Sequence, residues 1–395
     1  MKPLRIFTVL IVEEDNSLWH RQFGTSLKRM GHEVLLPLGV PLRDTWRQRA
    51  AGLWGDKERN AFTERLLSLL KAAHQQAPVD LLFVYLYPWQ FSPALFEEAT
   101  ALGIPSLYFF CDNLSEPNTA SLQGRTATLC WVPEVEALPQ FQAARAKYLH
   151  LPMASTPDIN FPVSAVEEPY CYFLGGKNPS RRRILGYVAR QGIDLRIYGA
   201  GWTAAETYES HFLQDTSQES AMTDSQRFQR WLGYKYYSVL DLLKHGIEPR
   251  LRVRRYARLG EEYESDLRPC VMTTVLDEQA ANAKCSQAGV TIGINEQFVN
   301  RGPRPLLCFS KLRDFEATMA GACYLTQATP DLPALFEEDK EIMTYQSEAE
   351  LVDKARFLLQ RPATRTQMRN AAMKRALGEH DWIHRFERAF KHLGL

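Results

Sequence analysis

The chain has 395 residues, more than one ordinary hydrophobic core accommodates, and this length predicts two or three domains. Hydrophobic residues make up 45% and charged residues 24%, as is usual for a globular protein. The 47 lysines and arginines nearly balance the 46 aspartates and glutamates, which excludes a global positive field that would gather nucleic acid or anionic membrane.

The first 150 residues alternate apolar runs with helical patterns. The run IFTVLIV (6–12) predicts a buried strand, and apolar residues at 19, 23, 27 and 30 predict a helix after it. Two more strands, DLLFVYLY (80–87) and IPSLYFFCDN (104–113), flank the helical segment PALFEEATALG. This order predicts a parallel sheet with helices on both faces, and so a Rossmann-like domain over residues 1–155.

A second alternating series follows a Pro-containing connector at 151–169 and predicts a second Rossmann-like domain over 156–379. Residues 203–268 are polar, aromatic and Arg-rich, and they predict a helical insertion in that domain. The fold class we expect is therefore α/β, with two doubly wound domains and a ligand cleft between them. The strands predicted for the second domain are CYFLGG, IDLRIYGAG, CVMTTVL, AGVTIGIN, ACYLTQA and EIMTY.

The segment RDFEATMAGACYLT (313–326), followed by KEIMTY (340–345), is the most specific in the chain. It resembles the donor-site signature of GT-B glycosyltransferases, especially the branch similar to spore-maturation proteins and family-4-like enzymes. Weaker similarity extends through CYFLGGKNPSRRRIL, IYGAGW and the terminal EHDWIHRF. The resemblance implies a nucleotide-sugar donor, such as a UDP-sugar, on the second domain, and a last helix (380–395) that joins the first domain.

The resemblance also implies roles for three residues in this segment. Glu316 would accept hydrogen bonds from both ribose hydroxyls of the nucleotide, Arg313 would face a phosphate or support Glu316, and Gly321 would allow close approach to the ligand or to a neighbouring strand. Many relatives carry a second glutamate eight positions earlier, where this chain has Cys308. A sugar-contacting carboxylate at that position is therefore not expected here.

The turn GGKNPSRRRIL (175–185) ends one predicted strand and begins a helix near Pro179. Free backbone N–H groups at a helix start form an anion site. Gly175, Gly176, Lys177 and Arg181 are therefore candidate ligands of a donor diphosphate. The alternative is a capped, solvated and basic helix start with no ligand.

Transfer with inversion needs a general base near the acceptor hydroxyl, and polar residues after the strands of the first domain are candidates. Acidic residues 13–15 follow the first strand, His20 lies in the first helix, and Asp112 follows the strand at 104–113. We take His20 and Asp112 as the candidate catalytic residues. The alternatives are a helix cap for Asp15 and a polar helix face for His20.

Other motifs are missing from the sequence. It contains no H-E-x-x-H, D-x-D or clustered His/Cys spacing, and so predicts no metal and no cofactor other than the nucleotide-sugar substrate. The seven single cysteines predict free thiols, and no apolar run reaches the length of a membrane span, so we expect a cytoplasmic protein. An arginine run at 250–258 leaves a membrane or nucleic-acid contact open, although a solvated helix is favoured.

Taken together, these patterns favour a metal-independent transferase that moves a hexosyl or related sugar. Its acceptor is open and could be a glycan, a lipid-linked sugar, a protein or a small molecule. Two other functions fit the same fold: a sugar-nucleotide epimerase, and a non-catalytic subunit that binds nucleotide sugars.

Overall fold

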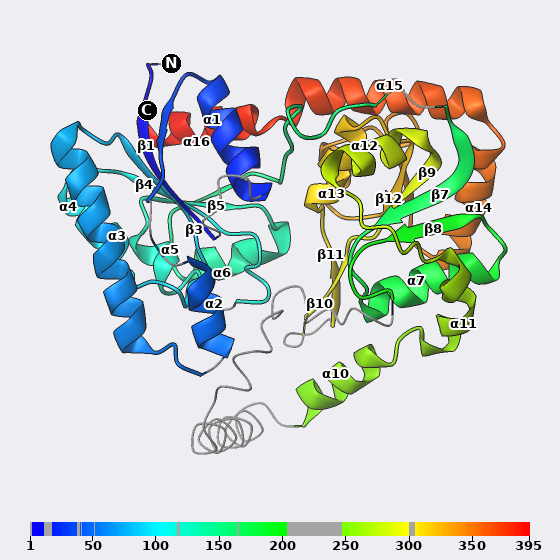
Figure 1. The fold of residues 1–395 in the computed structure, drawn as a ribbon, viewed down its shortest axis with the longest axis horizontal. Coiled ribbons are helices and arrows are strands. Elements are labelled where there is room, and N and C mark those ends of the chain that lie inside the picture. Colours follow the sequence, from blue (N-terminus) through cyan, green and yellow to red (C-terminus); the bar gives the residue numbers. More distant parts are fainter. Residues whose placement is uncertain are drawn as a thin grey trace. The chain divides into compact units, whose positions relative to one another are not determined.

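A computed structural model describes residues 2–11, 18–37, 40, 42–50, 52–116, 119–163, 166–203, 247–299 and 305–395 (Figure 1). The chain folds into two compact units. Unit 1 comprises Met1–Ile159 together with His380–Leu395, and unit 2 comprises Asn160–Glu379. The sequence analysis placed the corresponding boundaries after residues 155 and 379.

Unit 1 is built on a six-stranded parallel sheet in the order β2-β1-β3-β4-β5-β6 (Figure 1). Every residue of β3 and all but the first of β1 are buried, because helices cover both faces of such a sheet. β2 lies on one side of β1 and β3 on the other, so the chain order reverses between β1 and β3. The strands are β1 (Arg5–Leu10), β2 (Glu33–Leu35), β3 (Leu81–Tyr85), β4 (Ser106–Phe109), β5 (Leu129–Val132) and β6 (Tyr148–His150).

The helices of unit 1 follow the expected alternation, and the first one is the predicted helix, with Phe23 and Leu27 fully buried. It opens with a π-helical turn, η1, and continues as α1. The helices are η1 (His20–Gly24), α1 (Thr25–Arg29), α2 (Leu42–Ala50), α3 (Asp56–Gln76), α4 (Ala94–Ala101), α5 (Gln123–Thr126), η2 (Val135–Ala137), α6 (Leu138–Ala143) and α16 (Trp382–Leu393).

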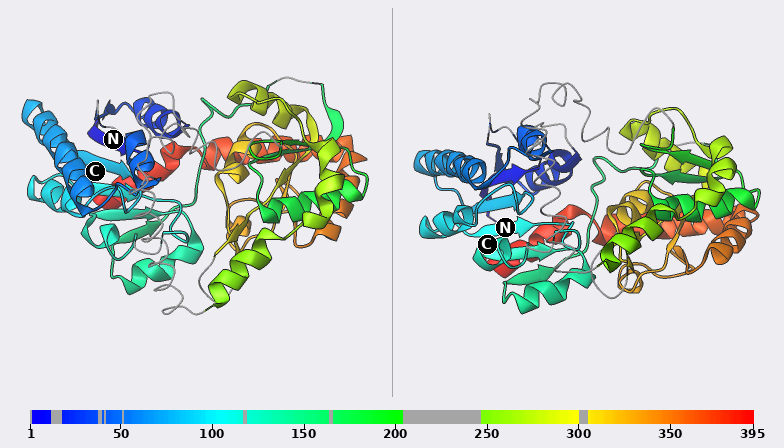
Figure 2. Two further views of the ribbon diagram at one scale, coloured as in Figure 1. Left: turned by 60° about the horizontal axis from the view of Figure 1, so that its bottom comes forward. Right: turned by 90° about the horizontal axis from the view of Figure 1, so that it is seen from below.

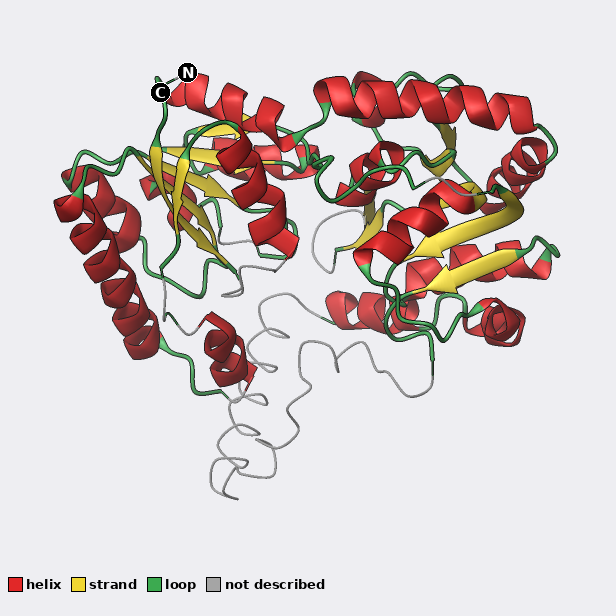
Figure 3. Ribbon diagram, turned by 45° about the horizontal axis from the view of Figure 1, so that its top comes forward, coloured by secondary structure: helices red, strands yellow, loops and turns green. Residues whose placement is uncertain are grey.

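The last helix, α16, belongs to unit 1 although more than two hundred residues separate it from the rest of that unit. Asp381 caps its first turn by accepting from the backbone N–H of Ile383 at 3.2 Å. The Arg385 guanidinium then donates to the carbonyl of Pro152 at 3.0 Å. The two termini consequently lie near one another (Figures 2 and 3).

Unit 2 contains a five-stranded parallel sheet in the order β13-β12-β9-β7-β8 and a small antiparallel pair, β10-β11. Two parallel α/β sheets with helices confirm the predicted fold class. The strands are β7 (Glu168–Leu174), β8 (Leu195–Tyr198), β9 (Ala288–Gly293), β10 (Glu296–Phe298), β11 (Leu306–Cys308), β12 (Tyr324–Gln327) and β13 (Met343–Tyr345).

One predicted strand of unit 2 was wrong. In CVMTTVL, Cys270 ends a 3₁₀ turn and Val271 makes only an isolated bridge to Ile197 on β8. The rest of the segment is irregular, and Val275 is 83% exposed. β8 is the edge of the sheet, so this segment can pair on one side only: Cys270 and Val271 pack against the core, while Thr273, Thr274 and Val275 are exposed.

Among the helices of unit 2, α7 contacts α10, α11 and α14, and α15 contacts both α13 and α14. No described helix is long and apolar enough to cross a bilayer. Most of the predicted insertion, residues 204–246, lies outside the described part of the chain; α10, η3 and α11 form the rest. The helices are α7 (Pro179–Arg190), α10 (Glu248–Ala257), η3 (Glu261–Tyr263), α11 (Glu264–Leu267), η4 (Arg268–Cys270), α12 (Glu278–Gln287), α13 (Leu312–Met319), η5 (Leu332–Ala334), α14 (Glu348–Leu359) and α15 (Pro362–Glu379).

Candidate functional site

The order of the strands in unit 2 indicates where a ligand would bind. β8 lies on one side of β7 and β9 on the other, so the chain order reverses between β7 and β9. In open α/β sheets, ligands bind outside the carboxyl ends of the strands at such a reversal. The predicted diphosphate turn (175–178) follows β7, and Asn295 and Glu296 follow β9, so both flank this point.

The turn after β7 is held by close backbone contacts. Gly199, with a φ of 131°, comes so close to Gly175 that an added Cβ would lie 2.4 Å from its carbonyl oxygen. That carbonyl accepts a hydrogen bond from Trp202 Nε1 at 2.7 Å. The side chain of Asn178 caps α7 by accepting from the N–H of Arg181 at 2.8 Å. A helix start thus follows the glycines, as the sequence predicted.

The cations of this turn contact groups of the protein itself. Lys177 Nζ lies 2.5 Å from Glu264 Oε1, and Arg181 Nη1 donates to the carbonyl of Gly176 at 2.7 Å. Arg182 Nε donates to the carbonyl of Leu259 at 2.9 Å. These bonds hold the segment containing α10 and α11 against α7. A diphosphate bound here would have to replace some of them.

Glu316 and Arg313 lie one turn apart on α13 and form an ion pair, with Arg313 Nη1 3.2 Å from Glu316 Oε2. The side chains are 9% and 32% exposed, respectively. Burial lowers the pKa of Arg313, but the nearby Glu316 carboxylate and other neighbouring groups outweigh that effect and raise it. Arg313 therefore stays charged, and its ion pair with Glu316 fixes the orientation of that carboxylate.

Asp314, on the same helix, is a functional candidate that the sequence analysis missed. It is fully buried, and its Oδ1 accepts from Tyr324 Oη at 2.8 Å, Thr326 Oγ1 at 3.0 Å and Asn295 Nδ2 at 3.2 Å. Oδ2 accepts from the N–H of Lys311 at 2.6 Å and so caps the helix. Burial raises the pKa of this carboxyl, while the four donors act in the opposite direction. Asp314 thereby fixes α13, and with it Glu316, against β9 and β12.

Glu296 forms a second buried link at the reversal point. Its Oε1 accepts from Ser180 Oγ at 3.1 Å, and its Oε2 accepts from Arg183 Nη2 at 2.9 Å. Both partners lie in α7, so this carboxylate ties the start of β10, which follows β9, to the helix that follows β7. The sequence shows Glu296 only as an acidic residue after a strand, and its partners are more than a hundred residues away.

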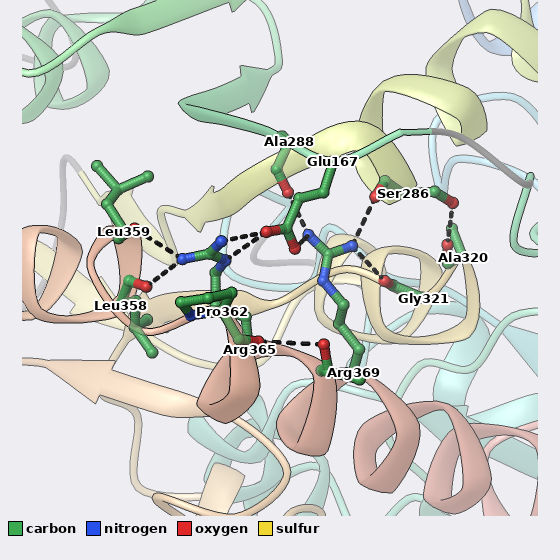
Figure 4. Close-up of polar contacts among 11 residues, drawn as sticks. Glu167, Ser286, Ala288, Ala320, Gly321, Leu358, Leu359, Pro362, Arg365 and Arg369 are labelled. Carbon is green, nitrogen blue, oxygen red and sulfur yellow. Dashed lines mark hydrogen bonds and ion pairs between the residues drawn. The ribbon is translucent and has the colours of Figure 1, made fainter.

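Gly321 directly follows Ala320, the C-cap residue of α13, and lies beside the side chain of Arg369 (Figure 4). It reverses the chain with a φ of 77°, and its carbonyl accepts from Arg369 Nη1 at 3.0 Å. Arg369 also binds the carbonyls of Ser286 and Ala288, where β9 begins. Gly321 is therefore at the amino end of the sheet, where an added Cβ would lie 3.2 Å from Pro162 Cβ. The sequence analysis predicted that Gly321 allows close approach to the ligand or to a neighbouring strand, and its place at the amino end of the sheet gives it a role in chain reversal.

In unit 1, Asp112 follows β4, and its Oδ2 accepts a hydrogen bond from Tyr87 Oη at 2.6 Å. His20 begins the π-helical turn after β1 and is 8% exposed. β3 lies between β1 and β4, so about 10 Å separates the two strand ends. The acidic residues predicted at 13–15 lie outside the described part of the chain.

The comparisons with known proteins agree with this architecture. Residues 242–391 match a family described as glycosyl transferase-like. Over 99% of both chains the fold is similar to that of sucrose-phosphate synthase from Thermosynechococcus elongatus, with 12% identity and a TM-score of 0.58. Anabaena HepE, solved in complex with UDP and glucose, gives the same identity and TM-score over 99% of this chain and 100% of its own. The chain has the GT-B glycosyltransferase fold.

The GT-B fold is also seen in a protein described as a putative UDP-N-acetylglucosamine 2-epimerase from Listeria monocytogenes, which is 10% identical with a TM-score of 0.51. That alignment covers 98% of this chain and 96% of the other. Comparison with curated protein sequences finds no match. The matched family segment contains α13 and its Glu316–Arg313 pair, whereas the similarity to the spore-maturation branch remains a prediction.

Proposed function

We propose that this protein is a glycosyltransferase that moves a sugar from a nucleotide-diphosphate sugar to an acceptor, with the donor bound by unit 2. The observation that carries the proposal is the Glu316–Arg313 pair on α13, inside the segment that matches the glycosyl transferase-like family. The strand reversal between β7 and β9 supports a ligand in this unit, and HepE, which has the same fold, was solved with UDP.

Each group of the site has a proposed task. Glu316 accepts hydrogen bonds from the two ribose hydroxyls, and Arg313 orients it. The turn at Gly175 and Gly176, with Lys177 and Arg181, stabilises the diphosphate charge as it departs with the nucleotide. In unit 1, Asp112 or His20 takes the proton of the acceptor hydroxyl. We assign no step to a metal ion, since the sequence has no D-x-D or clustered His/Cys motif.

A sugar-nucleotide epimerase is the second candidate, favoured by the structural similarity to the Listeria protein. Such an enzyme would convert a nucleotide sugar in the absence of any acceptor. A non-catalytic subunit would bind the donor without turning it over. Incubation with UDP-sugars with and without an acceptor mixture, followed by NMR of the sugar, distinguishes all three.

The donor site is tested by calorimetric titration of UDP and 2′,3′-dideoxy-UDP. Bonds to a charged group contribute about 1.5–3 kcal/mol each, so losing two in Glu316→Ala should weaken UDP binding about 100-fold or more. The wild type should prefer UDP over the dideoxy analogue strongly, and the variant should not.

Glu350→Ala is the matched control, because Glu350 on α14 also pairs with a cation one turn away, with Lys354 Nζ 2.8 Å from its Oε1. This variant should keep wild-type affinity and preference. If Glu316→Ala also keeps them, the placement of the donor in unit 2 is wrong.

A further inference from the structure

A group of aromatic and charged side chains lies beyond the carboxyl ends of β3 and β4 in unit 1. Tyr87 and Trp89 follow β3, which borders the strand reversal between β1 and β3. Asp112 and Glu116 follow β4, and Trp46 and Arg49 lie on α2. We call this group the Trp46 cluster, and its members are Trp46, Arg49, Tyr87, Trp89, Asp112 and Glu116.

The rings of the cluster hold one another edge to face. The Trp46 ring lies 4.7 Å from that of Tyr87 at an angle of 81°, and 4.9 Å from that of Trp89 at 84°. The Trp54 ring approaches Trp89 at 6.3 Å, and its Nε1 donates to the Trp89 carbonyl at 3.0 Å. Such contacts fix each ring without covering all of its surface.

Charged groups border these rings. Arg49 Cζ lies 4.1 Å from the centre of the Trp89 ring, and Arg49 Nη1 lies 3.8 Å from Glu116 Oε1. Partial burial raises the pKa of Glu116; Arg49 lowers it and Asp112 raises it further. The Asp112 carboxylate holds the Tyr87 hydroxyl at 2.6 Å. Two carboxylates and a guanidinium thus lie beside the indole rings at the carboxyl ends of β3 and β4.

The cluster differs from an ordinary part of the core in two ways. Its rings are only partly buried, and the side chains of Arg49 and Glu116 are 44% and 25% exposed. The indole N–H of Trp89 is buried and meets no hydrogen-bond acceptor among the described residues. A packed core buries its rings completely and pairs its donors. These features indicate a surface that is shaped for a ligand.

We propose that the Trp46 cluster binds a pyranose ring, so that the acceptor of the reaction is a saccharide. The apolar C–H face of such a ring packs on an indole, and its hydroxyls donate to carboxylates, which together match this combination of side chains. Asp112 then lies within the same cluster as the bound sugar, where a general base is needed. The assignment of this sugar as the acceptor rests on the proposed function, whereas saccharide binding itself does not.

Saturation-transfer difference NMR with three methyl glycosides, those of glucose, galactose and mannose, tests the proposal on the full chain. At least one glycoside should bind. Trp46→Leu should remove the apolar contact with the sugar face, and Glu116→Gln should remove a hydrogen bond to a charged group. Each change should weaken glycoside binding about 10-fold. Phe357→Ala is the matched control, since Phe357 is 39% exposed and carries Arg361 Cζ 4.0 Å from its ring in unit 2.

The control should bind the glycoside as the wild type does, and circular dichroism should show that all variants are folded. A sample with n-hexanol, an apolar probe, is measured alongside. The proposal is overturned if no glycoside binds, whether or not n-hexanol does, or if both cluster variants bind the glycoside as the wild type does. The NMR samples contain no nucleotide sugar, so the glycoside result does not depend on the result of the UDP titration of Glu316→Ala. If the wild type failed to bind UDP while a glycoside bound, the placement of the donor in unit 2 would lose its support and the saccharide site would stand.

Discussion

Two helices, one in each unit, pack against parallel sheets by different chemistry. In unit 1, α16 packs through rings: Trp382 lies 4.8 Å from Phe23 and 5.6 Å from Trp131 between ring centres, and all three are at most 1% exposed. In unit 2, α13 also buries Phe315, Ala317 and Met319, but it adds the buried carboxylate of Asp314, which accepts four hydrogen bonds.

The difference shows how each contact is specified. Ring packing is large in energy but weakly directional, which suits a helix whose task is to close a core. A buried carboxylate contributes less, yet it accepts donors only from particular directions, and a missing partner is costly. The polar contact is the one next to Glu316, where the position of a side chain matters most. Three substitutions test this comparison.

The largest effect is expected for Trp382→Ala. The change removes the ring contacts with Phe23 and Trp131 and the hydrogen bond from Trp382 Nε1 to Gln22 Oε1 at 2.7 Å. Replacing a buried tryptophan by alanine costs about 3–5 kcal/mol, to be measured by urea unfolding. Hydrogen exchange should rise in η1, β4 and β5, which carry the ring partners of Trp382, and not in unit 2. A uniform rise across both units would contradict the assignment of α16 to unit 1 alone.

Asp314→Asn should cost less, about 2–3 kcal/mol, because an amide of the same size can no longer accept from all four donors. Amide exchange should increase in α13 and β12, and UDP affinity should fall because Glu316 loses its support. Asp353→Asn, at an exposed position on α14, is the matched control and should change neither. Unchanged exchange in α13 would show that Asp314 does not hold the helix.

Gly293→Ala should have the smallest effect of the three, about 1–3 kcal/mol. An added Cβ would lie 2.2 Å from Tyr324 Oη and 2.3 Å from Thr326 Oγ1, so these two of the four donors to Asp314 must shift. Gly378→Ala on α15 meets nothing within 4 Å and should be neutral or gain up to ~1 kcal/mol. Thermal unfolding compares the two variants. Equal melting temperatures would mean that the polar network adapts to the extra methyl group.

The alternation of apolar runs and helical patterns was sufficient to predict two doubly wound units, since both periodicities are local properties of the chain. The buried strands at Leu81–Tyr85 and Ala288–Gly293 lie within runs that the sequence marks as continuous apolar segments. The segment CVMTTVL carries a similar signal and forms no strand, because its position beyond the edge strand β8 is not a local property.

The residue types of the candidate site were likewise visible in the sequence: Glu316 and Arg313 through the resemblance of their segment to GT-B donor sites, and Gly175 to Arg181 as a basic turn before a helix. Only the tertiary structure could show that Gly321 lies at the amino end of the sheet, or that the cations of the turn are bound to groups such as Glu264.

The Asp314 network and the Trp46 cluster also depend on the tertiary structure. Trp46 and Trp89 are 43 positions apart in the sequence, and Asp314 is bound by Asn295, which follows β9, and by Tyr324 of β12. Local patterns determine which segments become strands and helices, because backbone hydrogen bonds and burial of one face act over a few residues. Which side chains meet at the strand ends is decided by the order of strands in the sheet, and that order depends on contacts between distant parts of the chain.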